Sequence, residues 1–145
     1  MSRDPFDLER FVAAQDAHGT HARALDELRA GLKRSHWMWF VFPQIAGLGA
    51  SPMAQRYAVR SLDEAGAYLA HPVLGARYRE CVAVLNSLLT TDAKAVFGGI
   101  DAMKLRSSLT LFLRAAPTDE AFAHALEKFF GGAPDQRTLD LLSAG

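Results

Sequence analysis

The stretch HWMWFVFP, residues 36–43, constrains the fold more than any other part of the chain. It is apolar almost throughout, and its aromatic and β-branched residues favour a strand. Pro43 also pushes the preceding residue, Phe42, toward an extended conformation. A lone strand would leave its backbone groups unpaired, however, and the chain shows no second convincing strand. We therefore expect an extended buried segment or a short helix before Pro43, and not a sheet.

Helical patterns surround this stretch on both sides. Before it, apolar spacing predicts one helix that begins near Asp4 and a second that begins at His21. After it, apolar residues recur at helical spacing for about four turns between Leu74 and Leu89. Capping or breaking residues mark further helix starts at Ser51, Ser61, Asp101, Pro117 and Asp135. The prediction is an all-α fold, a single compact domain over residues 1–145, with about seven helices and one extended aromatic segment.

The composition is that of an ordinary globular protein. Half of the 145 residues are hydrophobic and 22% are charged, which excludes a disordered or fibrous chain. Sixteen basic and sixteen acidic residues cancel, so the long-range field that attracts nucleic acid or anionic membranes is missing. We therefore expect neither nucleic acid nor a membrane as a partner, and an anion could bind only at a local group of basic residues.

Cysteine and histidine positions argue against a metal site or a disulfide framework. Cys81 is the only cysteine, and the five histidines form no spaced metal motif. We expect no metal and no cofactor. The first residues lack the apolar core of a signal peptide, and no apolar run approaches the roughly 20 residues that span a bilayer. A cytoplasmic location is expected.

Three aromatic side chains near the basic end of the second predicted helix are candidates for a site. His36 could act as a base or could bridge a backbone group at the edge of the core. Trp37 and Trp39 would point the same way in an extended segment, which suits stacking on a planar ligand, and they would serve a core equally well. We expect at least one of the two tryptophans to be largely buried.

A polar helix face provides a second set of candidates. Lys104, Ser107 and Ser108 share one face by their spacing, and hydroxyls inside a helix compete for backbone hydrogen bonds. A ligand anion would explain them, as would exposed or back-bonded serines. Asp101 as a helix cap would place Lys104 in the first turn, where the dipole favours an anion. Gly47 and Gly49 could serve a tight turn or could let a ligand approach the bare backbone.

The chain resembles the family of uncharacterised bacterial and fungal proteins called domain of unknown function 1810. The resemblance rests on residues 33–44, 47–49, 69–75, 101–112 and 129–139, so it spans nearly the whole chain. It implies a compact helical domain and no established activity. Some relatives carry the label calpastatin, which names a disordered inhibitor, and a chain that is half hydrophobic does not fit that label. The order of elements is also similar to that of helical N-glycosidases that act on ADP-ribose-like compounds.

Our leading hypothesis is that residues 33–49 and 101–110 meet in one pocket for a small anionic, nucleotide-like molecule. Lys104 should then lie within about 10 Å of residues 37–49. If the protein is an enzyme, which the sequence leaves open, the first reaction to test is hydrolysis of a glycosidic or phosphate-linked bond. His36 and Asp101 are the candidate proton-transfer residues. The candidate ligand-binding residues are Lys33, Trp37, Trp39, Gln44, Gly47, Gly49, Lys104, Arg106, Ser107 and Ser108.

The rival hypothesis is a non-enzymatic interaction module. In that case residues 37–42 would be exposed and would dock a partner protein or a second copy of the chain. A large apolar patch around Trp37, Trp39 and Phe40 would favour association, whereas a concave pocket with converging basic groups would favour a ligand.

Overall fold

The computed structural model describes residues 4–144 and confirms the all-α class. Those residues form no β-strand, and a single isolated parallel bridge joins Ile45 to Val59. None of the described helices is long and apolar enough to cross a membrane. The elements in chain order are α1 (Glu9–Asp16), the 3-10 turn η1 (Ala17–Gly19), α2 (Thr20–Arg29), α3 (Met38–Val41), α4 (Pro52–Arg56), α5 (Leu62–Ala70), α6 (Leu74–Ser87), α7 (Ala93–Phe97), α8 (Gly99–Ala115), α9 (Glu120–Phe130) and α10 (Gln136–Ala144).

The sequence-based estimate of about seven helices is lower than this because it leaves out the single-turn helices α3 and α7. Each has only four or five residues, which is too few to show a helical repeat in the sequence. Most of the longer helices begin close to the predicted positions, but α1 begins at Glu9 and not near Asp4. Ser51, Ser61, Asp119 and Asp135 accept hydrogen bonds from backbone amides at the starts of α4, α5, α9 and α10.

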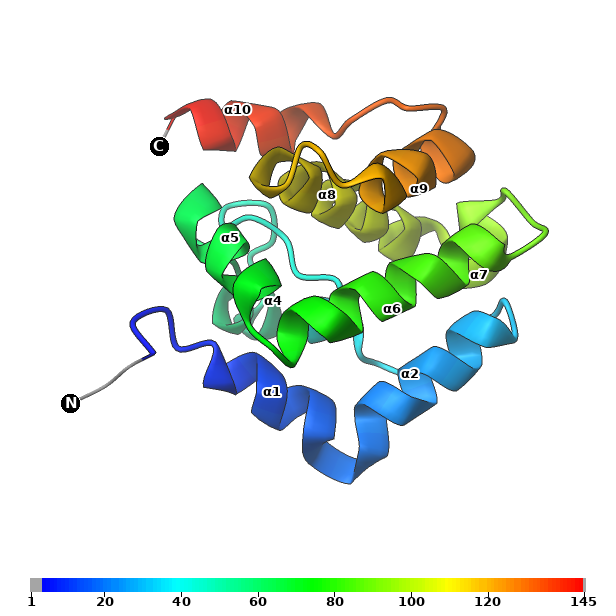
Figure 1. Cartoon of the computed structure of the whole chain (residues 1–145), viewed down its shortest axis with the longest axis horizontal. Helices are drawn as coiled ribbons and strands as arrows, with labels where there is room; N and C mark the ends of the chain where they lie inside the picture. The colour runs from blue at the N-terminus through cyan, green and yellow to red at the C-terminus, as the bar shows by residue number, and fades with distance from the viewer. Residues whose placement is uncertain (1–3, 145) are drawn as a thin grey trace.

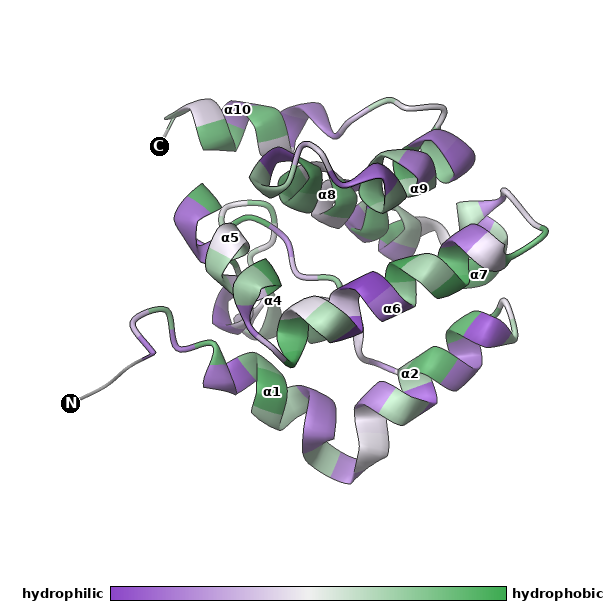
Figure 2. Cartoon of the chain, viewed as in Figure 1, coloured by the Kyte–Doolittle hydropathy of each residue, from purple (hydrophilic) through white to green (hydrophobic). Residues whose placement is uncertain are grey.

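The helices pack around α6 and α8 (Figure 1). Helix α6 contacts α2, α5 and α9, whereas α8 contacts α5, α7, α9 and α10. Helices α1 and α2 form a V on one side of the molecule, and α10 lies along α8 on the opposite side. Hydrophilic and hydrophobic residues are mixed around α1, α2 and α9 (Figure 2), as expected for helices that bury one face.

Residues 37–42, except Trp39, are buried in this core. Met38–Val41 form the short helix α3, so the helical alternative is confirmed and the extended aromatic segment is not. Trp37 and Phe42, on either side of α3, are fully buried. The ring of Phe42 lies 5.6 Å from that of Tyr78 and 6.2 Å from that of Phe97. The amides of Val41 and Phe42 donate to the carbonyls of Trp37 and Met38, and the Gln15 side chain donates to the carbonyl of Phe40. These bonds pair part of the buried backbone without a sheet.

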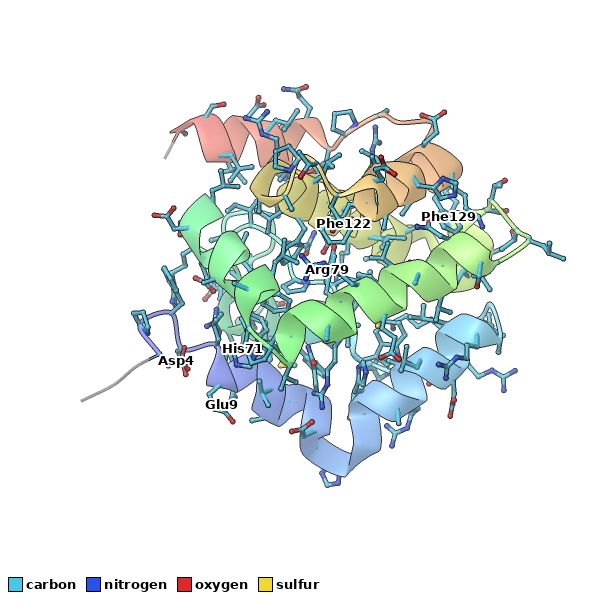
Figure 3. The ribbon with its side chains drawn as sticks, in the orientation of Figure 1. Asp4, Glu9, His71, Arg79, Phe122 and Phe129 are labelled. Atoms are coloured by element: carbon cyan, nitrogen blue, oxygen red, sulfur yellow. The ribbon has the colours of Figure 1, made fainter. Side chains whose placement is uncertain are left out.

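Charged side chains start α1 and join helices that are distant along the chain. The carboxylate of Asp4 accepts the amides of Leu8 and Glu9, at 2.7 and 2.9 Å, and starts α1 (Figure 3). The buried guanidinium of Arg10 then joins α1 to α5 through an ion pair of 2.9 Å with Glu64. Farther along the chain, Arg79 of α6 lies against the Phe122 ring of α9, 6.0 Å from its centroid (Figure 3).

The expectation that Asp101 caps α8 is wrong. The helix begins at Gly99, its N-cap is Gly98, and Asp101 is the third helical residue. Gly98 has a φ of 81°, a conformation that glycine adopts without strain, so the chain enters the helix there without a side-chain cap. Lys104 therefore lies in the second turn and not in the first.

Candidate functional site

A hollow of about 250 Å³, here called the first hollow, lies between the loop that follows α3 and the segment that contains α4. Trp39 lines it and is half-buried. Gln44, Gly47 and Gly49 line it from the loop, and Arg60 lines it from beyond α4. The isolated bridge between Ile45 and Val59 holds the two segments together, with hydrogen bonds of 2.8 Å on either side. Four predicted ligand-binding residues thus share one concavity.

A second hollow, of about 340 Å³, adjoins the first. The two share Gln44, Gly49 and Ala54 among their lining residues. Lys104 and Ser107 of α8 line the second hollow, and so does Arg137 from the start of α10. Gln44, Gly49 and Ala54 therefore form a wall that both hollows have in common.

Lys104 lines the second hollow and contacts Trp39, which lines the first. Its ammonium nitrogen lies over the Trp39 ring, 5.0 Å from the ring centroid, which is within the range of a cation–π interaction. The predicted proximity of Lys104 to residues 37–49 is confirmed by this contact. Oδ1 of Asp101 is 3.7 Å away, too far for a hydrogen bond, and no acceptor among the described residues binds the Lys104 ammonium. Its donors therefore make no hydrogen bond with the described residues, and its one ion pair, with Asp101, is long.

Lys33 and Trp37 belong to a different, buried cluster, so the structure does not bring them to the hollows. The Lys33 ammonium donates to the carbonyl of Ser35 at 2.5 Å and pairs with Oδ2 of Asp101 at 2.9 Å. Its side chain is only 8% exposed. Trp37 is fully buried, as expected for at least one of the tryptophans, and its indole N–H donates to Glu27 at 2.9 Å.

Glu27 organises this cluster. Its Oε1 accepts the amides of Arg34 and Ser35 as well as the Trp37 indole, and its Oε2 accepts the Ser35 hydroxyl at 2.5 Å. Burial by itself raises the pKa of a carboxyl group, but these hydrogen bonds outweigh it and lower the pKa of Glu27 from 4.5 to about 2. The cluster is a charged structural core between α2 and the segment before α3.

The two candidate proton-transfer residues lie apart from each other. His36 is exposed and makes no hydrogen bond or ion pair with the described residues, and it does not line either hollow. Asp101 has one oxygen paired with Lys33 and the other near Lys104. Neither residue is positioned to exchange a proton with a group bound in the first hollow.

The three remaining candidates on α8 make contacts with different parts of the protein. Ser108 is fully buried, and its hydroxyl is 2.9 Å from the Tyr78 hydroxyl, so it belongs to the core. The Ser107 hydroxyl lies 3.1 Å from both the Met103 carbonyl and the Asp135 carboxylate, which compete for its one proton, and Ser107 also lines the second hollow. Arg106 points toward α9 and α10 and donates to the carbonyl of Ala133 at 2.8 Å.

Packing explains both glycines of the loop. Gly47 has a φ of 102°, and a Cβ there would lie 3.2 Å from the Leu141 side chain of α10. A Cβ on Gly49 would lie 2.7 Å from the Ala54 Cβ, which is closer than such atoms approach. The tight-turn interpretation of these glycines is therefore sufficient, although both still line the first hollow.

Sequence reasoning missed Arg60 and Arg137, which line the hollows from outside the predicted segments. Neither lies in a recognisable motif, so no local signal could have identified them. No group of three or more histidine, cysteine, aspartate or glutamate side chains within residues 4–144 is arranged to hold a metal ion.

Comparisons with known proteins place the chain in a family without a described activity. Residues 5–142 match the family described as "Protein of unknown function (DUF1810)". The crystal structure of the conserved hypothetical protein Rv1873 from Mycobacterium tuberculosis is similar to this chain, with a TM-score of 0.93 and 50% sequence identity over 97% of this chain and 99% of that one. A search of curated proteins finds no match.

Proposed function

The chain belongs to the DUF1810 family of proteins of unknown function, and we propose that it binds a small anionic molecule with a planar ring, such as a nucleotide, in the first and second hollows. The observation that carries this proposal is the position of Lys104. Its ammonium lies over the Trp39 ring and has no hydrogen-bond acceptor among the described residues. An aromatic surface and a cation with free donors thus stand at the junction of two concave regions.

The chemistry of this junction suits a ring that carries a phosphate group. Trp39 offers a partly accessible indole on which a planar ring can stack. A phosphate or carboxylate can accept the free donors of Lys104, and such charge-assisted hydrogen bonds are about twice as strong as neutral ones. Gln44 lines both hollows and can donate to or accept from polar groups on the ring.

The competing interaction module required an exposed aromatic segment. Trp37, Phe40 and Phe42 are at most 7% exposed, so they offer no surface to a partner. Burial therefore favours the ligand over docking through residues 37–42.

Hydrolysis of an N-glycosidic bond would need an acid or base beside the bound molecule. Asp135 is the one carboxylate that lines either hollow among the described residues, and it already accepts hydrogen bonds from Ser107 and Thr138. We therefore propose binding without assigning a reaction.

The test is a titration of the protein with AMP, GMP, CMP and UMP, with the matching nucleosides and inorganic phosphate as partial ligands. We expect at least one nucleotide to raise the melting temperature, because a ligand that binds only the folded state stabilises it. The same nucleotide should quench tryptophan fluorescence, and Trp39→Phe should abolish the quenching because Trp37 is buried.

Lys104→Ala should weaken binding of that nucleotide about tenfold or more, which corresponds to about 1.4 kcal/mol. Lys94→Ala is the matched control, since Lys94 is an exposed lysine of α7 that lines neither hollow. Equal responses of the two variants, or no response of the wild-type protein to any probe, would refute the proposal.

A further inference from the structure

Arginines without partners are concentrated around the loop of residues 44–49. Most described arginine side chains bind a carbonyl, a carboxylate or an aromatic ring. Within residues 4–144 such a contact is missing for Arg34, Arg60, Arg114 and Arg137. Arg60, Arg114 and Arg137 line hollows around this loop, and Arg34 does not.

Two of these arginines meet in a third hollow, of about 470 Å³, between the start of α5, the end of α8 and α10. Arg60 and Arg114 line it, and Leu141 and Leu142 of α10 form an apolar wall. Asp63 is the one carboxylate that lines it among the described residues, and it lies beyond ion-pair distance of both guanidinium groups. Two guanidinium groups therefore line a concave surface without an ion-pair partner among the described residues.

The third hollow adjoins the first but is separate from the second. It shares Ile45, Ala46 and Arg60 with the first hollow and has no lining residue in common with the second. Lys104 and Arg114 are ten residues apart on the same helix, α8, which corresponds to roughly 15 Å along its axis. The cationic groups thus lie on two sides of the hollow that Trp39 lines.

We propose that Arg60 and Arg114 in the third hollow bind a second phosphate group of the ligand whose ring stacks on Trp39. The ligand is then a nucleotide with two separated phosphate groups, as in a nucleoside 3′,5′-bisphosphate, and not a monophosphate or a chain of adjacent phosphates. This inference rests on the proposed function. A guanidinium group donates two parallel hydrogen bonds to phosphate, so two arginines without ion-pair partners in one hollow suit a phosphate group.

The experiment compares the 5′-monophosphate, the 5′-diphosphate and the 3′,5′-bisphosphate of the nucleoside with the largest response in the first screen. Dissociation constants are measured by calorimetry for the wild-type protein, Arg114→Ala and Arg34→Ala. We expect the bisphosphate to bind the wild-type protein at least tenfold more tightly than the other two. Arg114→Ala should remove this advantage and leave the monophosphate affinity unchanged, whereas Arg34→Ala, which removes an equally exposed and unpartnered arginine, should keep it.

The outcomes separate the two proposals. Equal affinities for the three nucleotides in the wild-type protein, or an equal loss for all of them in Arg114→Ala, would overturn the second phosphate site while nucleotide binding itself stands. If none of the three binds, both proposals are wrong. Circular dichroism and melting curves of each variant show whether it is folded, and Arg114→Lys, which keeps the charge but not the paired donors, should retain only part of the bisphosphate advantage.

Discussion

Trp37 and Trp39 stand two residues apart in the chain and lie in contrasting surroundings. Trp37 is fully buried and donates its indole N–H to Glu27, whereas Trp39 is half-buried, lines the first hollow and lies under the Lys104 ammonium. In a strand these side chains would point the same way, but here Trp37 is the N-cap of α3 and Trp39 lies inside the helical turn. One tryptophan thus holds the core together, and the other is partly accessible in the first hollow.

The two lysines near Asp101 show the same contrast. Lys33 pairs with Asp101 at 2.9 Å and its side chain is only 8% exposed, so its charge is neutralised inside the protein. Lys104 lies 3.7 Å from the other oxygen of Asp101 and is 24% exposed. A nearby positive charge is therefore evidence of a binding site only where its donors remain free.

The largest expected effect is the loss of folding stability when the buried Trp37 is replaced. Trp37→Ala should cost roughly 3–5 kcal/mol of folding free energy, because it leaves a large cavity and removes a partner of Glu27. Trp39→Ala should cost less than about half as much, since its ring is already partly accessible. Urea denaturation of both variants measures the difference, and similar losses would show that the two tryptophans are structurally equivalent.

A smaller effect is expected from the pH dependence of the Glu27 cluster. The pKa of Glu27 falls from 4.5 to about 2 on folding, so its stabilising contribution is complete above pH 4.5 and is lost as the pH falls toward 2. The shift corresponds to about 3 kcal/mol. Denaturation of the wild-type protein and Glu27→Gln between pH 5 and pH 2 checks this. The wild-type stability should fall more steeply, and parallel curves would contradict the assigned role.

The smallest effect concerns Lys104. In the absence of ligand, Lys104→Ala should change stability by less than about 1 kcal/mol, because it removes a partly exposed cation–π contact and a weak ion pair within α8. The position of Lys104 in the second turn removes the dipole-based reason to expect a gain in stability. Thermal and urea denaturation provide the measurement. A loss of several kcal/mol would mean that Lys104 is a structural residue like Lys33.

Much of the fold could be predicted because its signals are local. Ser61 and Asp135 each cap a helix by accepting a hydrogen bond from an amide three residues later. The helix of residues 74–87 shows its apolar repeat directly in the sequence. The conformation of residues 38–41 could not be settled in the same way. A four-residue segment shows no period, and its aromatic residues fit a strand as well as a buried helical turn.

The candidate site was predictable only in part. The sequence indicated Trp39, Gln44 and Lys104, which the structure brings to adjoining hollows. It also indicated Lys33, Arg106 and Ser108, whose side chains bind other parts of the protein. Residue type and spacing show which groups are capable of binding a ligand, but they do not show which groups already have a partner.

By itself the sequence determined the family, the all-α class and the positions of most helix ends, because apolar periodicity, caps and breakers act over a few residues. Only the tertiary structure decided which of the two tryptophans is buried, which of the two lysines forms a buried ion pair and which arginines have no partner. Those outcomes depend on partners such as Glu27 and Asp101, which lie 10 residues from Trp37 and 68 from Lys33 along the chain. Folding brings these distant groups together, and no local sequence pattern shows which of them will be in contact.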